Sequence, residues 1–244
     1  AKSEVLYTAF MDLSQAFDCV NRDKLWSILY TLGLDPQLVT FLRQLHANNT
    51  ARISMDSKGG TTRAFEIKKG VRQGCIMAPF LFNIYTNDLE VHLLKIAEDS
   101  PRIGQLRLPL LLYADDAVLI SRTARGLQKL IEGYTTYMDN LGLSVNIAKS
   151  YTMILSKRAA KKVPNFYCNN IRLKHVNYFL YLGIVFDNRS LWGPMRSTKI
   201  AQFTKVCGAL FGFSARLGGK PFAPLIEIYR AKCVSIMTYG AEIW

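Results

Sequence analysis

The chain has 244 residues, half of them hydrophobic, which is enough to bury the core of one large domain or two modest ones. Lysine and arginine outnumber aspartate and glutamate by 31 to 18, a net charge of +13. This excess favours a polyanionic partner, nucleic acid before a membrane, because no basic amphipathic helix dominates. No apolar run reaches the roughly 18–20 residues of a membrane span. Five dispersed cysteines without CxxC spacing argue against a zinc site or a disulfide framework.

The first half of the chain predicts a buried strand followed by capped helices and short strands. Apolar and β-branched runs indicate the strands, while Asn, Asp, Pro and Gly mark the helix ends. In chain order, these patterns predict a strand over 5–11, helices from Asn21 to Gly33 and from Pro36 to Ala47, strands over 50–55 and 61–67 around a turn, and a long helix from Pro79 to Ile96.

The second half predicts a hairpin, a helix with clear caps and a helical tail. Its patterns predict hairpin strands over 106–113 and 117–121, a helix from Thr123 to Gly142, an exposed basic loop at 157–162, strands near 171–175 and 181–186, and helices from Met195 onward with a break at 218–221. This order of elements indicates an α+β fold that ends in an all-helical segment.

Asp115 and Asp116 stand in the middle of the apolar run LLLYADDAVLI, which spans 110–120. Buried carboxylates are costly unless they are paired, hydrogen-bonded or bound to a cation. One interpretation is an acidic hairpin tip that reaches water, since Asp is a common turn residue. The other is a site that receives positive charge. Asp12 favours the second, because it ends another predicted strand that can lie beside the hairpin in one sheet.

Three carboxylates without His or Cys suit hard cations that prefer oxygen ligands, such as Mg²⁺. Two such ions, about 3.5–4 Å apart, can clamp the attacking and leaving oxygens of a phosphoryl transfer. The three histidines stand far apart in the sequence, which disfavours a His-based metal site or triad. The residues alone therefore favour phosphoryl-transfer chemistry at the aspartates, with solvated turn residues as the alternative.

Five short segments resemble, in the correct order, the motifs of reverse transcriptases, and more narrowly those of non-LTR, LINE-type retrotransposons. They are FMDLSQAFD at 10–18 (motif A), GVRQGCIMAP at 70–79 with Phe82 and Asn83 (motif B), YADD at 113–116 (motif C), GLSVNIAK at 142–149 (motif D) and YLG at 181–183 (the primer grip). The final run IYRAKCVSIMTYGAEIW resembles the thumb helices of that family. YADD alone would be a weak signal, whereas five ordered motifs are a specific one.

The resemblance implies a right-hand polymerase palm, an antiparallel sheet with helices packed on it, followed by an α-helical thumb. The motifs divide the chain into a palm over 1–187 and a thumb over 188–244. The N-terminal fingers, which carry the basic residues that grip the triphosphate in this family, are expected to be missing, because the chain starts on the strand that leads into motif A.

The resemblance assigns a metal site to three aspartates and one backbone carbonyl. Asp12 and Asp115 would coordinate two Mg²⁺ ions, with Mn²⁺ as a substitute, and the carbonyl of Leu13 would bind the nucleotide-side ion. Asp116 would complete the acidic cluster as an outer ligand. Lys149 matches the motif D lysine that would protonate the leaving pyrophosphate. The alternative for Lys149 is a surface lysine after a turn.

The resemblance implies that Leu13, Phe17, Gln73 and Gly74 bind the incoming nucleotide. Phe17 falls at the steric-gate position, where a ring would clash with a ribonucleotide 2′-hydroxyl, and it can be a core residue at the same time. Gln73 and Gly74 match the pair that lies against the nucleotide and template, where glycine lets the backbone approach closely. Arg72 is expected to contact a phosphate or the template, with a solvated surface arginine as the alternative.

The resemblance also implies contacts to template and primer for Tyr113 of YADD and for Tyr181, Leu182 and Gly183 of YLG. Leu182 and Gly183 would shape the primer grip, which is a role of structure more than of chemistry.

The sequence therefore predicts an enzyme, the core of an RNA-directed DNA polymerase that transfers nucleotides from dNTP to a primer 3′-hydroxyl on an RNA template. The expected partners are the RNA template, the DNA primer, dNTP, and an upstream fingers segment or other domains of a parent protein, with no membrane. The expected location is intracellular, in the nucleus or cytoplasm. The alternative is a catalytically incomplete retrotransposon remnant that binds nucleic acid or a protein partner.

Overall fold

The computed structural model describes residues 5–55, 60–72, 74–157, 163–216, 218 and 222–244. They form two compact units. The sheet unit comprises Leu6–Thr152 and Lys162–His175. The C-terminal unit comprises Ala1–Val5, Met153–Lys161 and Val176–Trp244. The mixture of a central sheet with packed helices confirms the predicted mixed α/β character, while the predicted palm and thumb boundaries stay a prediction.

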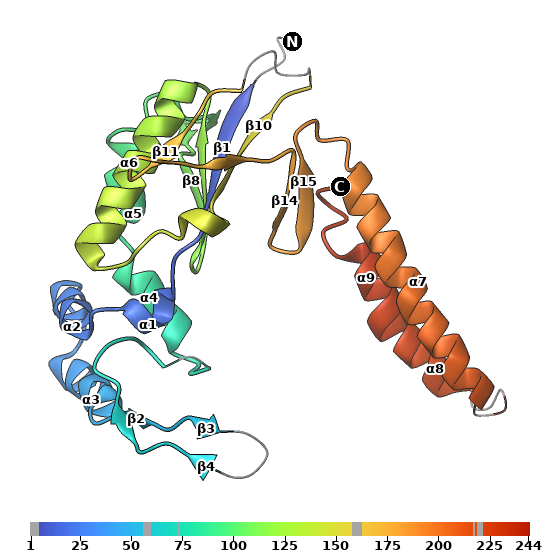
Figure 1. The fold of residues 1–244 in the computed structure, drawn as a ribbon, viewed down its shortest axis with the longest axis horizontal. Coiled ribbons are helices and arrows are strands. Elements are labelled where there is room, and N and C mark those ends of the chain that lie inside the picture. Colours follow the sequence, from blue (N-terminus) through green and yellow to red (C-terminus); the bar gives the residue numbers. More distant parts are fainter. Residues whose placement is uncertain (1–4, 56–59, 73, 158–162, 217, 219–221) are drawn as a thin grey trace. The chain divides into compact units, whose positions relative to one another are not determined.

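A five-stranded sheet organises the sheet unit, with the strand order β13-β10-β1-β9-β8 (Figure 1). The strands are β1 (Leu6–Met11), β8 (Leu110–Tyr113), β9 (Asp116–Ser121), β10 (Tyr151–Leu155) and β13 (Lys174–His175). β1 runs antiparallel to β9, and β9 runs antiparallel to β8, whereas β10 and β13 are parallel. Because sheet neighbours need not be sequence neighbours, β1 comes to lie beside a hairpin more than 100 residues further along the chain.

One face of this sheet packs on helices and forms the core. Ala9 and Met11 of β1 pair with Leu119 and Ala117 of β9, and all four belong to the buried cluster. Helix α6 (Ala124–Leu141) covers this face, as Figure 1 shows. Its buried residues recur at helical spacing: Leu127, Leu130, Ile131, Tyr134, Thr135 and Met138.

The caps of the predicted helices appear where the sequence places them. The Asn21 side chain accepts from the Lys24 N–H at the start of α2 (Arg22–Thr31), and Asp35 accepts from Gln37 at the start of α3 (Pro36–His46). Thr123 accepts from Gly126, and α6 ends at Gly142, which adopts a φ of 80°. These side chains satisfy N–H groups that the first helical turn leaves unpaired.

The predicted long helix from Pro79 to Ile96 is wrong, because it is two helices, α4 (Ala78–Tyr85) and α5 (Leu89–Leu94). Thr86, Asn87 and Asp88 separate them. The Thr86 hydroxyl donates to the Phe82 carbonyl. The N–H groups of Asn87 and Leu89 each donate to the carbonyl three residues earlier, which makes tight turns in place of a continuous α-helix. Residues of this kind bond their own neighbouring backbone, so that they weaken a helix interior.

The strands predicted over 50–55 and 61–67 are each divided into two short strands, and three strands predicted for the second half of the chain are interrupted as well. Leu106–Arg107 (β7) pairs with Arg102–Ile103 (β6), and Pro109, which lacks an N–H, separates β7 from β8. The strand expected near 181–186 is instead a hairpin of β14 (Tyr178–Tyr181) and β15 (Ile184–Asp187), because the chain turns at 182–183. The strand expected near 171–175 is divided into β12 (Ile171–Arg172), which pairs with β11 (Tyr167–Cys168), and β13.

The segment between α3 and α4 forms two short ladders. β2 (Thr50–Ala51) pairs with β5 (Phe65–Glu66), and β3 (Ser54–Met55) pairs with β4 (Gly60–Thr61). Most of the predicted turn between them and most of the predicted basic loop at 157–162 lie outside the described residues.

Arg22 fastens this segment to the helices. Its guanidinium donates to the carbonyls of His46 (2.8 Å), Ile67 (2.9 Å) and Gly70 (2.8 Å), with a longer contact to Lys69. His46 ends α3, while the other three carbonyls lead into the region of motif B. The planar fork of Arg22 therefore joins the end of α3 to the backbone at 67–70, next to the β2–β5 pairing.

Gly70 brings the start of motif B against the end of motif A. Its N–H donates to the Val20 carbonyl at 2.8 Å, and Val71 donates to Phe17 at 2.8 Å. A Cβ on Gly70 would meet the carbonyl oxygen of Asp18 at 2.7 Å, and the φ of Gly70 is 87°. Only glycine fits here, both sterically and conformationally.

The C-terminal unit holds the β14–β15 hairpin and a long helical segment. Its helices are α7 (Gly193–Arg216), α8 (Phe222–Ile228), the π-helical turn η2 (Tyr229–Val234) and α9 (Ser235–Thr238). They confirm the predicted helical tail. The Asp187 carboxylate joins hairpin and helices by accepting from the backbone N–H groups of Arg189, Leu191 and Trp192.

Replacing Gly70 with alanine should destabilise the sheet unit by about 2 kcal/mol or more, because backbone strain and a backbone clash add. Gly33→Ala is the matched control. Gly33 has a similar φ of 79°, but nothing lies within 4 Å of its added Cβ, so that only about 1 kcal/mol is expected. Urea unfolding of the two variants measures the difference. Equal losses would contradict the steric account.

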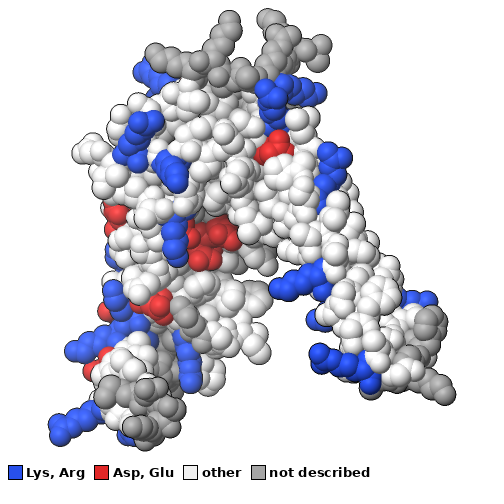
Figure 2. Space-filling view, turned by 45° about the vertical axis from the view of Figure 1, so that its right-hand side comes forward, with Lys and Arg blue, Asp and Glu red and all other residues white. Residues whose placement is uncertain are grey.

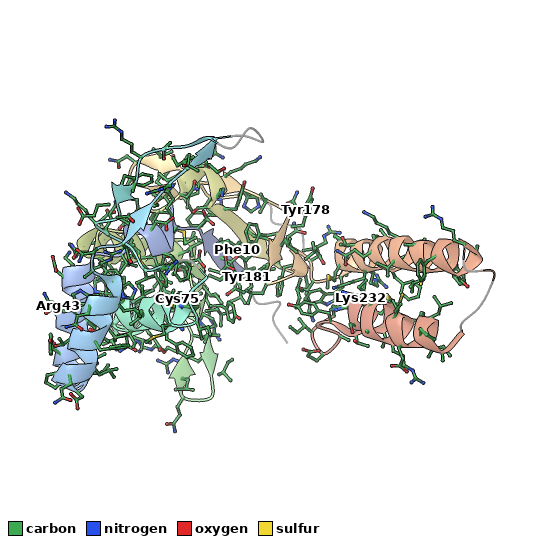
Figure 3. All side chains as sticks on the ribbon, turned by 90° about the horizontal axis from the view of Figure 1, so that it is seen from below. Phe10, Arg43, Cys75, Tyr178, Tyr181 and Lys232 are labelled. Carbon is green, nitrogen blue, oxygen red and sulfur yellow. The ribbon has the colours of Figure 1, made fainter. Side chains whose placement is uncertain are left out.

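Replacing Arg22 with lysine should cost about 1–3 kcal/mol of unfolding free energy, because one ammonium cannot reach the several carbonyls that the fork contacts. Arg43→Lys is the control, since Arg43 is an exposed arginine on α3 (Figure 3). Chemical denaturation of both variants tests the prediction, and an Arg22→Lys chain as stable as the control would refute it.

Candidate active site

The backbone around Asp12 is held by the segment that carries motif D. Asp12 follows β1, and its carbonyl accepts from the Asn146 N–H at 2.8 Å. Its own N–H donates to the Ser150 hydroxyl at 3.1 Å. Next to it, Leu13 forms a bridge with Val145, and Ser14 donates to the Ser144 carbonyl at 2.8 Å. Motif A is therefore fixed at the point where its carboxylate leaves the sheet.

The turn between β8 and β9 carries the second and third carboxylates. Tyr113 pairs with Asp116, so that Ala114 and Asp115 form a two-residue turn. Ala114 has a φ of 53°, which is uncommon for a residue with a side chain. The prediction of a hairpin with Asp115 and Asp116 at its tip is confirmed.

Strand register places Asp12 opposite Asp116. The last pair of β1 and β9 is Met11 with Ala117, and the next residues along the same register are Asp12 and Asp116. Side chains alternate along a strand, so these two aspartates take the face of Phe10 and Val118, opposite the face that packs on α6.

The charges of neighbouring carboxylates act on Asp12 and on Asp116. Burial raises the pKa of Asp12, and the charge of Asp115 adds to this, while Lys149 and a hydrogen bond from Asn146 oppose it. Burial also raises the pKa of Asp116, with Asp115 and Asp12 as the further causes. Like charges therefore gather here with Lys149 as the nearby cation, which makes the site attractive to further positive charge.

The donor atoms fit a hard divalent cation, since carboxylate and backbone oxygens are the ligands that Mg²⁺ prefers. Within the described residues, no three His, Cys, Asp or Glu side chains enclose a metal position by themselves. This is compatible with Mg²⁺, which is commonly held by one or two carboxylates and completed by water and substrate phosphates.

A cleft of about 640 Å³ adjoins the YADD turn. Phe17, Tyr113 and Ala114 line it, together with Asn83 and the exposed ring of Phe80. The Phe17 ring lies 4.9 Å from that of Phe82, centroid to centroid. Phe17 therefore packs on a core residue and also borders this cleft, while its role as a steric gate stays a prediction.

The remaining predicted residues of the sheet unit lie in different settings. Lys149 is exposed, ends the short helix η1 (Ile147–Lys149) and acts on the charge of Asp12. Arg72 is exposed and lines a separate cleft of about 190 Å³ with Asp18 and Lys69. Gly74 is exposed with a φ of 79° and open space where a Cβ would be. Gln73 lies outside the described residues.

Tyr181, Leu182 and Gly183 belong to the C-terminal unit. Tyr178 and Tyr181 are the first and last residues of β14, and Figure 3 labels both. Leu182 and Gly183 form the turn of the hairpin, with φ values of 47° and 76°.

Two supporting residues of the site were not predicted, Asn146 and Ser150. Asn146 anchors Asp12 through both backbone and side chain, and Ser150 accepts from the Asp12 N–H and donates to the Asn146 carbonyl. The signal for Asn146 was present, because Asn before a short helix is a cap, and its side chain accepts from the Lys149 N–H. No local pattern connects Ser150 with Asp12.

Comparison with known proteins gives a consistent family. The model of the family described as "Reverse transcriptase (RNA-dependent DNA polymerase)" matches residues 1–186. The RNA-directed DNA polymerase from mobile element jockey of Drosophila melanogaster is 24% identical over 97% of this chain and 25% of its own length. The Pol polyprotein from type-2 retrotransposable element R2DM of the same organism is 27% identical over 74% of this chain and 17% of its own length. The chain thus spans a quarter or less of these two non-LTR relatives.

Solved structures support the fold. An apo telomerase from Candida tropicalis, truncated from its C-terminal domain, aligns with a TM-score of 0.51 at 18% identity, over 77% of this chain and 35% of its own. A telomerase of the same organism in complex with a fragment of telomeric RNA aligns with a TM-score of 0.52 at 16% identity, over 77% and 29%.

Among the described helices, none is both long and apolar enough to cross a membrane.

The match over 1–186 covers most of the chain and the segments that hold Asp12, Asp115 and Asp116. The chain therefore belongs to the reverse transcriptase (RNA-dependent DNA polymerase) family.

Proposed function

We propose that this chain is the core of an RNA-directed DNA polymerase, which joins dNTP to a primer 3′-hydroxyl on an RNA template. The observation that carries the proposal is the convergence of Asp12 and the Asp115–Asp116 turn, two regions distant in sequence, on one point of the sheet. Family membership supports the same reaction.

Asp12, Asp115, Asp116 and the carbonyl of Leu13 would hold two Mg²⁺ ions, which supply charge stabilisation to the transferring phosphoryl group. Asp12 and Asp115 are the main ligands of this proposal, and exposed Asp116 the outer one. The hydrogen bonds of the Asp12 backbone, from the Asn146 N–H and to the Ser150 hydroxyl, would hold Asp12 still while substrate binds, because positioning provides much of the rate in phosphoryl transfer.

Lys149 is proposed to donate a proton to the leaving pyrophosphate. It is exposed, so it can exchange protons with solvent, and its charge acts on Asp12. Phe17 is proposed to exclude the ribonucleotide 2′-hydroxyl, with Gln73 and Gly74 against the nucleotide and Tyr113 on the primer side of the cleft. The palm would be residues 1–187 and the thumb 188–244.

The net charge of +13 supports a nucleic-acid partner. In Figure 2, Lys and Arg are spread over the visible face, whereas Asp and Glu gather in a few small patches. A spread of cations suits contacts to phosphates, which position a nucleic acid without reading its sequence.

Asp115→Asn should lower Mg²⁺-dependent primer extension by at least about 100-fold, because the amide is a weaker metal ligand of the same shape. The assay uses a DNA primer annealed to an RNA template and the longest form of the protein that extends it. Asp139→Asn, an exposed aspartate on α6, is the control and should extend normally. Undiminished primer extension by Asp115→Asn would contradict the proposal.

Phe17→Ala should raise the efficiency of ribonucleotide incorporation relative to deoxyribonucleotide by about tenfold or more, since a steric exclusion of this kind is worth 1–3 kcal/mol. Phe17→Tyr keeps the ring and should keep the discrimination. Because Phe17 also packs on Phe82, thermal unfolding of Phe17→Ala must be measured beside the kinetics. A variant that loses stability and keeps its sugar selectivity would show a core role alone.

A further inference from the structure

The turn of the β14–β15 hairpin has an unfavourable backbone. Its two residues, Leu182 and Gly183, both have positive φ, as two-residue hairpin turns with matching twist require. Glycine adopts this conformation freely, but leucine does so rarely. Such strain persists only where surrounding structure maintains it.

Tyr239 supplies that support. Its hydroxyl donates to the Leu182 carbonyl at 2.8 Å. Its ring occupies the space that a side chain on Gly183 would need, since an added Cβ would lie 3.0 Å from the ring. Tyr239 thus contacts both residues of the turn, although it lies 57 positions after Leu182 in the sequence.

The end of the chain holds Tyr239 in place. The Trp244 indole N–H donates to the Tyr239 carbonyl at 3.0 Å. Lys199 of α7, only 6% exposed, places its ammonium 4.7 Å from the centroid of the Tyr239 ring, within cation–π range. A Cβ on Gly240 would meet Ile184 of β15 at 2.8 Å, so this segment packs directly on the hairpin.

The hairpin presents apolar side chains to solvent while Tyr239 holds its turn. Tyr178 and Leu180 lie on one face of β14, and Leu182 follows in the turn; the three side chains are 66%, 62% and 38% exposed. Contiguous exposed apolar side chains on a protein surface commonly mark an interaction site. Aromatic and apolar side chains can contact the sugars and bases of a nucleic acid irrespective of sequence.

We propose that Tyr239 is a positioning residue, which fixes the Leu182–Gly183 turn so that the exposed row Tyr178, Leu180 and Leu182 can meet the primer strand of a bound duplex. The identity of the partner rests on the proposed polymerase function, whereas the hold of Tyr239 on the turn does not. Tyr239 itself needs no contact with substrate.

The first test compares Tyr239→Phe, which removes only the hydroxyl, with Tyr229→Phe. Tyr229 is a tyrosine of the same unit, 43% exposed, whose ring lies 6.4 Å from that of Phe203 and not on the hairpin turn. Hydrogen exchange of the Tyr181 and Ile184 amides reports on the turn without any catalysis. Fluorescence anisotropy with a labelled DNA primer on an RNA template reports on duplex binding.

In Tyr239→Phe we expect faster exchange of these two amides and a duplex Kd raised by about two- to tenfold, the range that one hydrogen bond provides. The control variant should change neither, and thermal unfolding should separate a local from a global effect. Unchanged amide exchange in Tyr239→Phe would overturn the proposal. Faster exchange with an unchanged Kd would equally overturn it, because the turn would then not serve the duplex.

A rescue variant makes the test specific. Adding Leu182→Asn to Tyr239→Phe should return both amide exchange and duplex Kd to within about twofold of the starting protein, because Asn-Gly favours this turn without outside support. Leu182→Asn alone measures any loss of the leucine side chain. Failure of the rescue beyond that loss would contradict a positioning role. The polymerase proposal is tested separately by the loss of primer extension in Asp115→Asn.

Discussion

Repulsion between like charges is the constraint on which the candidate site depends. After burial, the largest cause, the charge of Asp115 contributes to the raised pKa of Asp12, and the charges of Asp115 and Asp12 contribute to the raised pKa of Asp116, so the folded chain holds these like charges near one another. What holds them is backbone. The β1–β9 ladder sets Asp12 opposite Asp116, and the carbonyl and N–H of Asp12 are both bonded to the motif D segment. Two hydrogen bonds, from the Asn146 N–H and to the Ser150 hydroxyl, therefore fix the backbone from which the Asp12 carboxylate extends.

The surrounding architecture follows from that need for a rigid backbone. α6 covers one face of the sheet with a continuous apolar stripe, which leaves the other face to carry the carboxylates. Gly70 and Arg22 tie the start of motif B to the end of motif A and to the residues that directly follow it. Both turns that carry predicted functional residues contain a non-glycine residue at positive φ, Ala114 in one and Leu182 in the other. Strained turns of this kind need a firm scaffold.

Sequence predicted the parts of the fold that local chemistry decides. Asn21, Asp35 and Thr123 cap helices as expected, and the apolar run around Asp115 forms a hairpin with its acids at the tip. Two of the errors fall where short polar or proline-containing stretches interrupt a longer pattern, at Thr86–Asp88 and at Pro109. The three carboxylates were found by residue type and motif order. Ser150 and Tyr239 were missed because their partners, Asp12 and Leu182, are distant in sequence and share no periodic pattern with them.

A double-mutant cycle on Asp12→Asn and Asp116→Asn tests most directly whether these carboxylates form one site. Native-state hydrogen exchange of β1 and β9 amides, without divalent cations and at neutral pH, gives the unfolding free energy of each chain. Each single variant should be slightly more stable than the starting protein, by less than about 1 kcal/mol because water screens half-buried charges. The double variant should gain clearly less than the sum, since both substitutions remove the same repulsion. Strictly additive effects would contradict the account, because they would mean that the two carboxylates do not share a site.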